Sequence, residues 1–164
     1  MKSFVKNLFL VVLCIASIFI LSSCQKSALP YSLKPSMQEE EIKRAMKENG
    51  FQYDFKDDNH LYFKSKTVYG VRTDFTVVIY DGDNKAEFLS IKHFYEKLSN
   101  DQHATVLEGL TKEYGNPVHY GGYANSVTGW YGGYKWTKGK VEIDFDDVEA
   151  EKHVVDITFT DYHY

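Results

Sequence analysis

Apolar residues recur every three or four positions in two segments of the chain, which is the spacing of an amphipathic helix. The apolar face of the first segment consists of Ile42, Ala45 and Met46. That of the second consists of Leu107, Leu110 and Tyr114. Residues suited to cap the helix N-termini are Ser36 in the first segment and Ser99 or Asp101 in the second, and glycines that can end them are Gly50 and Gly115. The pattern therefore predicts two helices.

Elsewhere, apolar and polar residues alternate with a period of two, which is typical of strands with one buried face. A strong turn signal, Asp81–Asn84, lies between the runs 76–80 and 87–93 and predicts a hairpin. Near the C-terminus, two further runs alternate apolar residues with acidic residues or threonine, over 141–146 and 155–160. We expect these segments to pair as antiparallel strands.

The predicted order is a helix, three or four strands, a second helix and three or four more strands. This order predicts an α+β fold, a two-layer sandwich in which both amphipathic helices cover the apolar face of an antiparallel sheet. A shift of 65 positions aligns Lys47–Gly50 with Lys112–Gly115. A diverged α-β-β-β duplication is one explanation of this match, and the ordinary chemistry of helix ends is the other.

The N-terminus has the pattern of an export signal. Lys2 and Lys6 precede an uncharged stretch at 8–21, shorter than the about 20 apolar residues that span a membrane. Residues Leu21-Ser22-Ser23-Cys24 resemble the lipobox of bacterial lipoproteins. The resemblance implies that residues 1–23 are removed and that Cys24 carries the lipid, whereas an uncleaved anchor helix is the alternative. The expected location is the cell envelope. In a Gram-negative cell, Gln25 after the cysteine favours sorting to the outer membrane. In a Gram-positive cell, the domain would lie on the outer face of the plasma membrane.

The remainder of the chain divides into a lipidated cysteine with a proline-containing tether, 24–35, and a single α+β domain, 36–164. Cys14 lies in the removed segment and Cys24 carries the lipid, so no disulfide is expected in the domain. By the order of its elements, the domain resembles small envelope modules of the PepSY, beta-lactamase-inhibitor-protein and outer-membrane assembly lipoprotein types. The resemblance does not extend to signature residues.

Composition and charge narrow the classes of function. Of the 164 residues, 43% are hydrophobic and 26% charged, which is ordinary for a folded chain and excludes wholesale disorder. The net charge is -4, and loss of Lys2 and Lys6 would make it about -6. Nucleic-acid-binding domains normally carry a basic surface, so we expect no nucleic-acid partner.

Catalytic and metal-binding patterns are missing from the sequence. The six histidines are scattered without a pair at metal-ligand spacing, and no free thiol remains to act as a nucleophile. Neither a Gly-x-Ser-x-Gly turn nor a glycine-rich phosphate loop occurs. We therefore predict no enzyme activity, no catalytic residues, no cofactor and no metal site.

Two groups of residues are candidates for binding. One is aromatic and glycine-flanked, and consists of Tyr120, Tyr123, Trp130, Tyr131 and Trp136. Three explanations are open for this aromatic group: packing in the core, a protein-binding surface, and a platform that binds carbohydrate. The other is acidic, and consists of Asp144, Asp146 and Asp147. It is either a solvated strand face or the docking site of a cationic partner, because its spacing lacks the glycine and the closing glutamate of a calcium loop.

Together these features predict a membrane-tethered envelope lipoprotein that acts as a non-enzymatic protein-binding module, with inhibitors and immunity proteins as one subtype. Its partners would be the membrane, through the lipid anchor, and another envelope or secreted protein. One alternative is a lipoprotein that binds carbohydrate, such as peptidoglycan, through its aromatic rings. The other is a structural factor in envelope assembly.

Overall fold

The computed structural model describes residues 29–80, 88–125, 129–149 and 154–162, and within these ranges the side chains outside 121–131, 147–149, 154–156 and 162. Its strands are β1 (Tyr53–Asp57), β2 (His60–Lys64), β3 (Thr67–Val68), β4 (Val71–Arg72), β5 (Phe75–Tyr80), β6 (Phe88–Tyr95), β7 (Val118–Asn125), β8 (Gly129–Lys138), β9 (Val141–Glu149) and β10 (Val154–Tyr162). The helices are a short 3-10 helix η1 (Pro30–Ser32), α2 (Glu39–Glu48) and α3 (Asn100–Tyr114).

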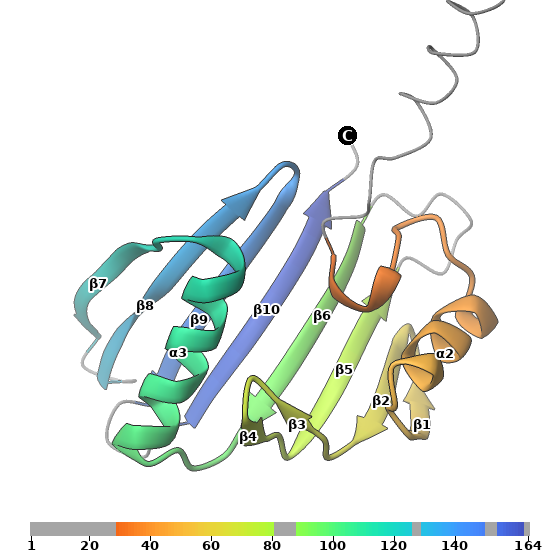
Figure 1. Ribbon diagram of the computed structural model, residues 1–164, viewed down its shortest axis with the longest axis horizontal. Helices are drawn as coiled ribbons and strands as arrows, with labels where there is room; N and C mark the ends of the chain where they lie inside the picture. The colour runs from red at the N-terminus through yellow and green to blue at the C-terminus, as the bar shows by residue number, and fades with distance from the viewer. Residues whose placement is uncertain (1–28, 81–87, 126–128, 150–153, 163–164) are drawn as a thin grey trace, which may run out of the picture.

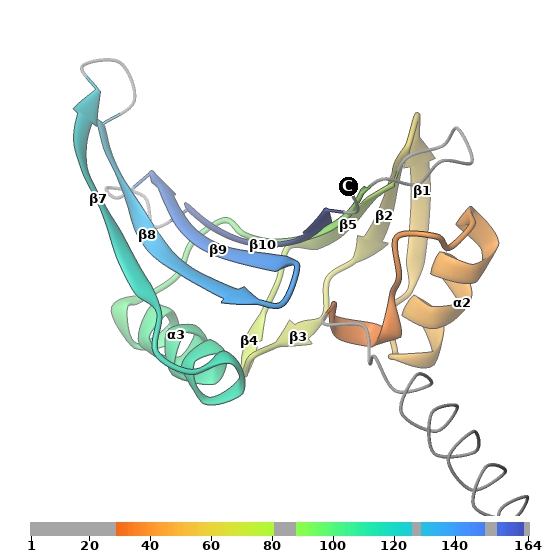
Figure 2. The ribbon, with the colours of Figure 1, turned by 90° about the horizontal axis from the view of Figure 1, so that it is seen from above.

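Within the described residues, eight of these strands form one antiparallel sheet in the order β1-β2-β5-β6-β10-β9-β8-β7, while β3 and β4 form a separate pair (Figure 1). The predicted α+β class and the antiparallel sheet are confirmed. The sheet is curved, and Figure 2 shows α2, α3 and the β3–β4 pair on its convex side. In the part of the chain that the structure describes, the concave side carries no helix.

Both predicted helices form, with small differences at their ends and faces. The cap of α3 is Ser99, whose hydroxyl accepts a hydrogen bond from the amide of Gln102. The capping box of α2 begins at Gln38, with Glu41 as its partner, and not at the predicted Ser36. The reason is that the carboxylate of Glu39, which Ser36 would need, is bonded to lysine side chains instead.

The core lies between the helices and the convex face of the sheet. Ile42 and Met46 of α2 and Val106 and Leu110 of α3 are fully buried, whereas the predicted Leu107 and Tyr114 are only partly buried. The sheet residues packed against them alternate along the strands, as the period of two predicted. They include Leu61, Phe63, Val78, Ile91, Ile143, Phe145, Ile157 and Phe159.

The sheet consists of two halves, and each half is a helix followed by four strands of the sheet. Helix α2 precedes β1, β2, β5 and β6, and helix α3 precedes β7 to β10. The halves meet at the centre of the sheet, where β6 pairs with β10. The last strand of each half is therefore internal, and the first strand of each half, β1 or β7, lies at an edge.

The start of the described chain is packed into the domain. Leu29 and Leu33 have exposed fractions of 3% and 0%, and the hydroxyl of Tyr31 is hydrogen-bonded to His93 Nε2 at 3.0 Å. These residues fall in the range 24–35 that the prolines led us to assign to a tether. Leu29, the first described residue, is thus already packed into the domain, and only residues 25–28 separate Leu29 from Cys24. No helix in the described ranges is long and apolar enough to cross a membrane.

Candidate functional site

The register of the sheet aligns outward-pointing side chains in rows across the concave face. A central row runs through directly paired positions on six neighbouring strands, from β8 to β2: Lys135, Asp144, Thr158, Lys92, Val77 and Tyr62. Residues two positions along each strand form parallel rows. The concave face therefore presents aromatic residues together with Lys92 on the β1–β6 half, and Lys135 with several acidic residues on the β8–β9 half.

Four aromatic residues on the first half, Phe55, Tyr62, Phe75 and Phe94, form a continuous aromatic row. The rings of Phe55 and Tyr62 are stacked with centroids 4.3 Å apart, and those of Phe75 and Phe94 are stacked at 4.6 Å. Tyr62 joins the two pairs, 6.2 Å from Phe75. Phe55 is 50% exposed and Phe75 is 37% exposed. A joined set of exposed rings on a sheet is a common feature of binding surfaces.

The aromatic row was not among the residues predicted from the sequence. Its members lie on four different strands, and consecutive members are 7, 13 and 19 positions apart, so no cluster is visible along the chain. The usable signal is the alternation itself: Tyr62 stands between the buried Leu61 and Phe63, which assigns it to the outward face. Large aromatic residues at outward positions of neighbouring strands are the pattern to look for.

The other half of the concave face carries an acidic patch of Glu142, Asp144 and Asp146. The ammonium of Lys135 lies 3.3 Å from carboxylate oxygens of both Glu142 and Asp144. Partial burial by itself lowers the pKa of Lys135, but the hydrogen bonds that its ammonium donates to these two carboxylates, together with their negative charge, outweigh burial and raise the pKa. Glu142 and Asp144 carry two negative charges against the one positive charge of Lys135, so this group keeps an excess of negative charge.

Two of the sequence-predicted binding residues are brought together here. Tyr120 on β7, Gly133 on β8 and Asp146 on β9 occupy paired positions, and the hydroxyl of Tyr120 donates a hydrogen bond to Asp146 Oδ1. The tyrosine reaches the aspartate across a glycine, which has no side chain to block the path. The contact orients the carboxylate at one end of the acidic patch.

A third predicted residue, Trp136, is not on this surface. It is 3% exposed, it belongs to the core cluster, and its indole N–H donates to the carbonyl oxygen of Gly115 at 2.7 Å. Of the explanations open for the aromatic stretch, core packing holds for this ring. The side chains of Tyr123, Trp130, Tyr131 and Asp147 lie outside those described, although their backbones belong to β7, β8 and β9.

The fully buried histidine, His93, has a structural role. Its Nδ1 is 2.8 Å from Thr76 Oγ1, its Nε2 meets Tyr31, and its ring stacks on Phe51. Burial, together with the positive charge of Lys66, lowers its pKa to about 3, which keeps the imidazole neutral. Among the described residues, no three metal-binding side chains are grouped so that they could hold an ion.

Comparison with protein-family models, with curated proteins and with solved structures finds no match to this chain. We therefore infer a function from the chemistry of the concave face.

Proposed function

We propose that the chain is a membrane-tethered lipoprotein of the bacterial envelope that binds another protein through the concave face of its sheet and catalyses no reaction. The observation that carries this proposal is the exposed aromatic row beside the acidic patch. Aromatic anchors next to charged groups are typical of protein-binding surfaces, because the rings supply buried area and the charges select the partner.

The arrangement of the rings favours a protein over a carbohydrate. A sugar packs its C–H groups against the free face of an aromatic ring. In the aromatic row, Phe55 and Tyr62 are stacked within 8° of parallel, and Phe75 and Phe94 within 25°, so many of the ring faces are covered by one another. Ring edges and stacked pairs suit the apolar side chains of a partner protein.

The charge on the other half of the face favours a cationic partner. Asp144 and Glu142 share the ammonium of Lys135, and each carboxylate can accept further hydrogen bonds from an arginine or lysine of a partner. An inhibitor or immunity protein that neutralises a basic toxin or hydrolase at the membrane is one subtype with these properties.

The lipid anchor is supported by the sequence 21–24 and by the way the chain joins the fold. Leu29 and Leu33 belong to the core cluster, which lies between the sheet and its helices, and the helices are on the convex side (Figure 2). A five-residue step from Cys24 to Leu29 spans at most about 18 Å. A lipid at Cys24 would thus hold the convex side towards the membrane and leave the concave face turned towards partners.

We also propose that the domain is a two-layer sandwich that arose by duplication of an α-β-β-β unit. A shift of 65 aligns the inward residues Val78 and Tyr80 of β5 with Ile143 and Phe145 of β9. Between β6 and β10 a shift of 66 is needed to keep inward residues aligned, as for Ile91 with Ile157. One additional residue before β10 reconciles the two shifts, and the matching order of elements in both halves supports an ancestral repeat.

The binding proposal is tested by site-specific photo-crosslinking in cells that produce the full chain. A photoreactive phenylalanine replaces Phe75 on the concave face or, as a control, Thr105, an exposed residue of α3 on the convex side. We expect one abundant crosslinked envelope protein from position 75, absent from position 105 and lost when Asp144→Lys is added. Crosslinks that are equal at both positions, or none at 75, would contradict the proposal.

The anchor is tested separately by mass spectrometry of the mature N-terminus together with membrane fractionation of wild type and Cys24→Ala. We expect an acylated Cys24 in the membrane fraction of the wild type and a chain without lipid in the variant. A soluble or uncleaved wild-type chain would contradict the lipoprotein assignment without affecting the test of the concave face.

A further inference from the structure

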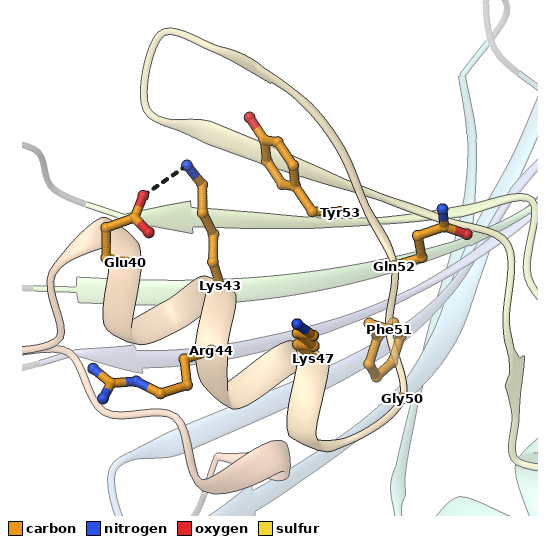
Figure 3. Close-up of a pocket in the computed structure, with 8 residues that line it drawn as sticks. All are labelled: Glu40, Lys43, Arg44, Lys47, Gly50, Phe51, Gln52 and Tyr53. Atoms are coloured by element: carbon orange, nitrogen blue, oxygen red, sulfur yellow. Dashed lines mark hydrogen bonds and ion pairs between the residues drawn. The ribbon is translucent and has the colours of Figure 1, made fainter.

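A pocket of about 710 Å³ lies between helix α2 and the start of β1 (Figure 3). It is lined by Glu40, Lys43, Arg44, Lys47, Gly50, Phe51, Gln52 and Tyr53. Three of these residues are cationic and one is acidic. We call this site the α2 pocket.

The charges of the α2 pocket are only partly neutralised. The ammonium of Lys43 is bonded to Glu40 at 3.0 Å, as Figure 3 shows, and also to Glu39. Arg44 and Lys47 project from successive turns of α2, and neither forms an ion pair with another described residue. In a chain with a net charge of -4, two adjacent unpaired cations at a pocket favour an anionic ligand.

Two of the other residues that line the pocket are aromatic. Phe51 forms part of the core edge and is 3% exposed, whereas Tyr53 is 39% exposed. Lys66 adds a further positive charge, since its ammonium lies 4.2 Å from the centre of the Phe51 ring. A ligand with an anionic group and an adjoining less polar part would therefore match both the cationic and the aromatic residues.

The α2 pocket also lies next to the segment through which the chain would be tethered. The ring of Tyr31 is 4.9 Å from that of Phe51, and the side-chain amide of Asn49 donates to the carbonyl oxygen of Tyr31. Tyr31 is seven residues after Cys24, a span of at most about 25 Å. A lipid-anchored chain would therefore keep the pocket within reach of the membrane surface.

From this geometry we propose that the α2 pocket binds the phosphate headgroup of an anionic glycerophospholipid. The guanidinium of Arg44 can pair with two phosphate oxygens, and Lys47 adds a second point charge. Tyr53 offers an amphipathic ring at the depth of the headgroups. The inference rests on the lipid anchor at Cys24 proposed above, because tethering raises the local concentration of headgroups so that a weak site is occupied.

The test uses the chain as isolated from membranes, in neutral detergent micelles, with ¹⁵N NMR of two glycine amides as reporters. Gly50 lines the pocket, and Gly139 lies in the β8–β9 turn as an internal control. The probes are dihexanoyl phosphatidylglycerol, dihexanoyl phosphatidylcholine and inorganic phosphate. We expect phosphatidylglycerol to shift the Gly50 signal saturably, with no change at Gly139 and none with phosphatidylcholine.

Two variants with the same change of charge identify the site. Arg44→Gln with Lys47→Gln should weaken the binding of phosphatidylglycerol by about tenfold or more, a loss of about 1.4 kcal/mol. Lys97→Gln with Lys140→Gln, two exposed lysines outside the pocket, should change it by less than about twofold. Equal losses in both variants would mean a nonspecific effect of net charge and would overturn the proposal.

The probes also separate the sources of the anion. Equal responses to inorganic phosphate and phosphatidylglycerol would overturn the lipid assignment and leave an anion site, and equal responses to both lipids would show apolar binding without charge recognition. No response at Gly50 overturns the site itself. None of these outcomes depends on the concave face, and acylation of Cys24 is measured independently, so failure here is distinguishable from failure of the proposed function.

Discussion

The hydroxyl of Tyr120 donates a hydrogen bond to the carboxylate of Asp146 across an intervening strand, over Gly133. A Cβ atom at position 133 would collide with the carbonyl oxygen of Phe145 and would approach Asp146 Oδ1 and the Tyr120 hydroxyl to 3.1 Å. The glycine therefore lets a tyrosine on the edge strand orient an aspartate two strands away. This relationship links the edge of the sheet to the acidic patch.

Gly133→Ala should destabilise the protein by about 3 kcal/mol, because the added methyl overpacks the sheet against backbone atoms that cannot move independently. Tyr120→Phe, which removes only the hydrogen bond, should cost about 1 kcal/mol. Urea denaturation measures both, with Thr137→Ala on the exposed face of β8 as a control. If Gly133→Ala were as stable as the wild type, the close approach across β8 would not exist.

The assignment of residues to the two faces of the sheet predicts unequal effects for two phenylalanines. Phe63 is 1% exposed, so Phe63→Ala should lower the free energy of unfolding by about 4 kcal/mol. Phe75→Ala, on the concave face, should lower it by about 1 kcal/mol, mainly through the lost stacking with Phe94. Chemical denaturation distinguishes the two. Similar losses for both would mean that the aromatic row is covered and not an exposed binding surface.

Stability should fall on mild acidification because of His93. Its pKa is lowered to about 3 in the folded state by burial, whereas the unfolded chain has an ordinary histidine value of about 6.5. The unfolded state therefore binds more protons below pH 6.5, and stability that is complete above this pH is lost as the pH falls. The contribution of this one group amounts to about 2 kcal/mol between pH 7.5 and pH 5.

The matched variants for this prediction are His93→Gln and Thr76→Val. The first removes the titrating ring and should flatten the pH dependence between pH 7.5 and pH 5. The second removes only the hydrogen bond to Nδ1, so it should lower stability at every pH while keeping the slope. Denaturation curves at several pH values measure the slopes. An unchanged slope in His93→Gln would show that another group is responsible.

The burial of Trp136 predicts a spectroscopic signature. Trp130→Phe leaves Trp136 as the single tryptophan of the chain, and its emission should be blue-shifted and protected from iodide quenching, because the indole packs in the core. Trp136→Phe should cost about 2 kcal/mol through a lost hydrogen bond to Gly115 and a cavity beside it. Red-shifted, readily quenched emission would mean that this ring is at the surface.

Some elements could be predicted from the sequence because their signals are local. The alternation of Val141, Ile143 and Phe145 with acidic residues predicted an inward and an outward face for one strand, and the burial of all three confirms it. The cap at Ser99 was recognisable because capping involves a residue and its neighbours three positions away. Trp136 was more difficult, because the aromatic stretch was open to core packing, protein binding or carbohydrate binding, and nothing local indicated which of these held for this ring.

Other features had no local signal. The prolines at 30 and 35 suggested an extended tether, yet Leu29 and Leu33 bury themselves in the core and Tyr31 bonds to His93, a residue 62 positions away. Burial of this kind depends on the space left by other elements. The aromatic row was missed for the same reason, because Phe55 and Phe94 become parts of one surface only after β1, β2, β5 and β6 are aligned.

The sequence by itself determined which residues alternate, where the two helices lie to within a few residues, and the pattern at 1–24 that resembles a lipoprotein signal. These properties follow from backbone geometry and from chemistry within a few residues. Only the tertiary structure decided that β6 pairs with β10, that the sheet curves away from its helices, and that aromatic and acidic residues share the concave face. Strand partners are chosen by the burial that the whole chain achieves, and a period of two identifies the two faces of a strand but not its neighbours.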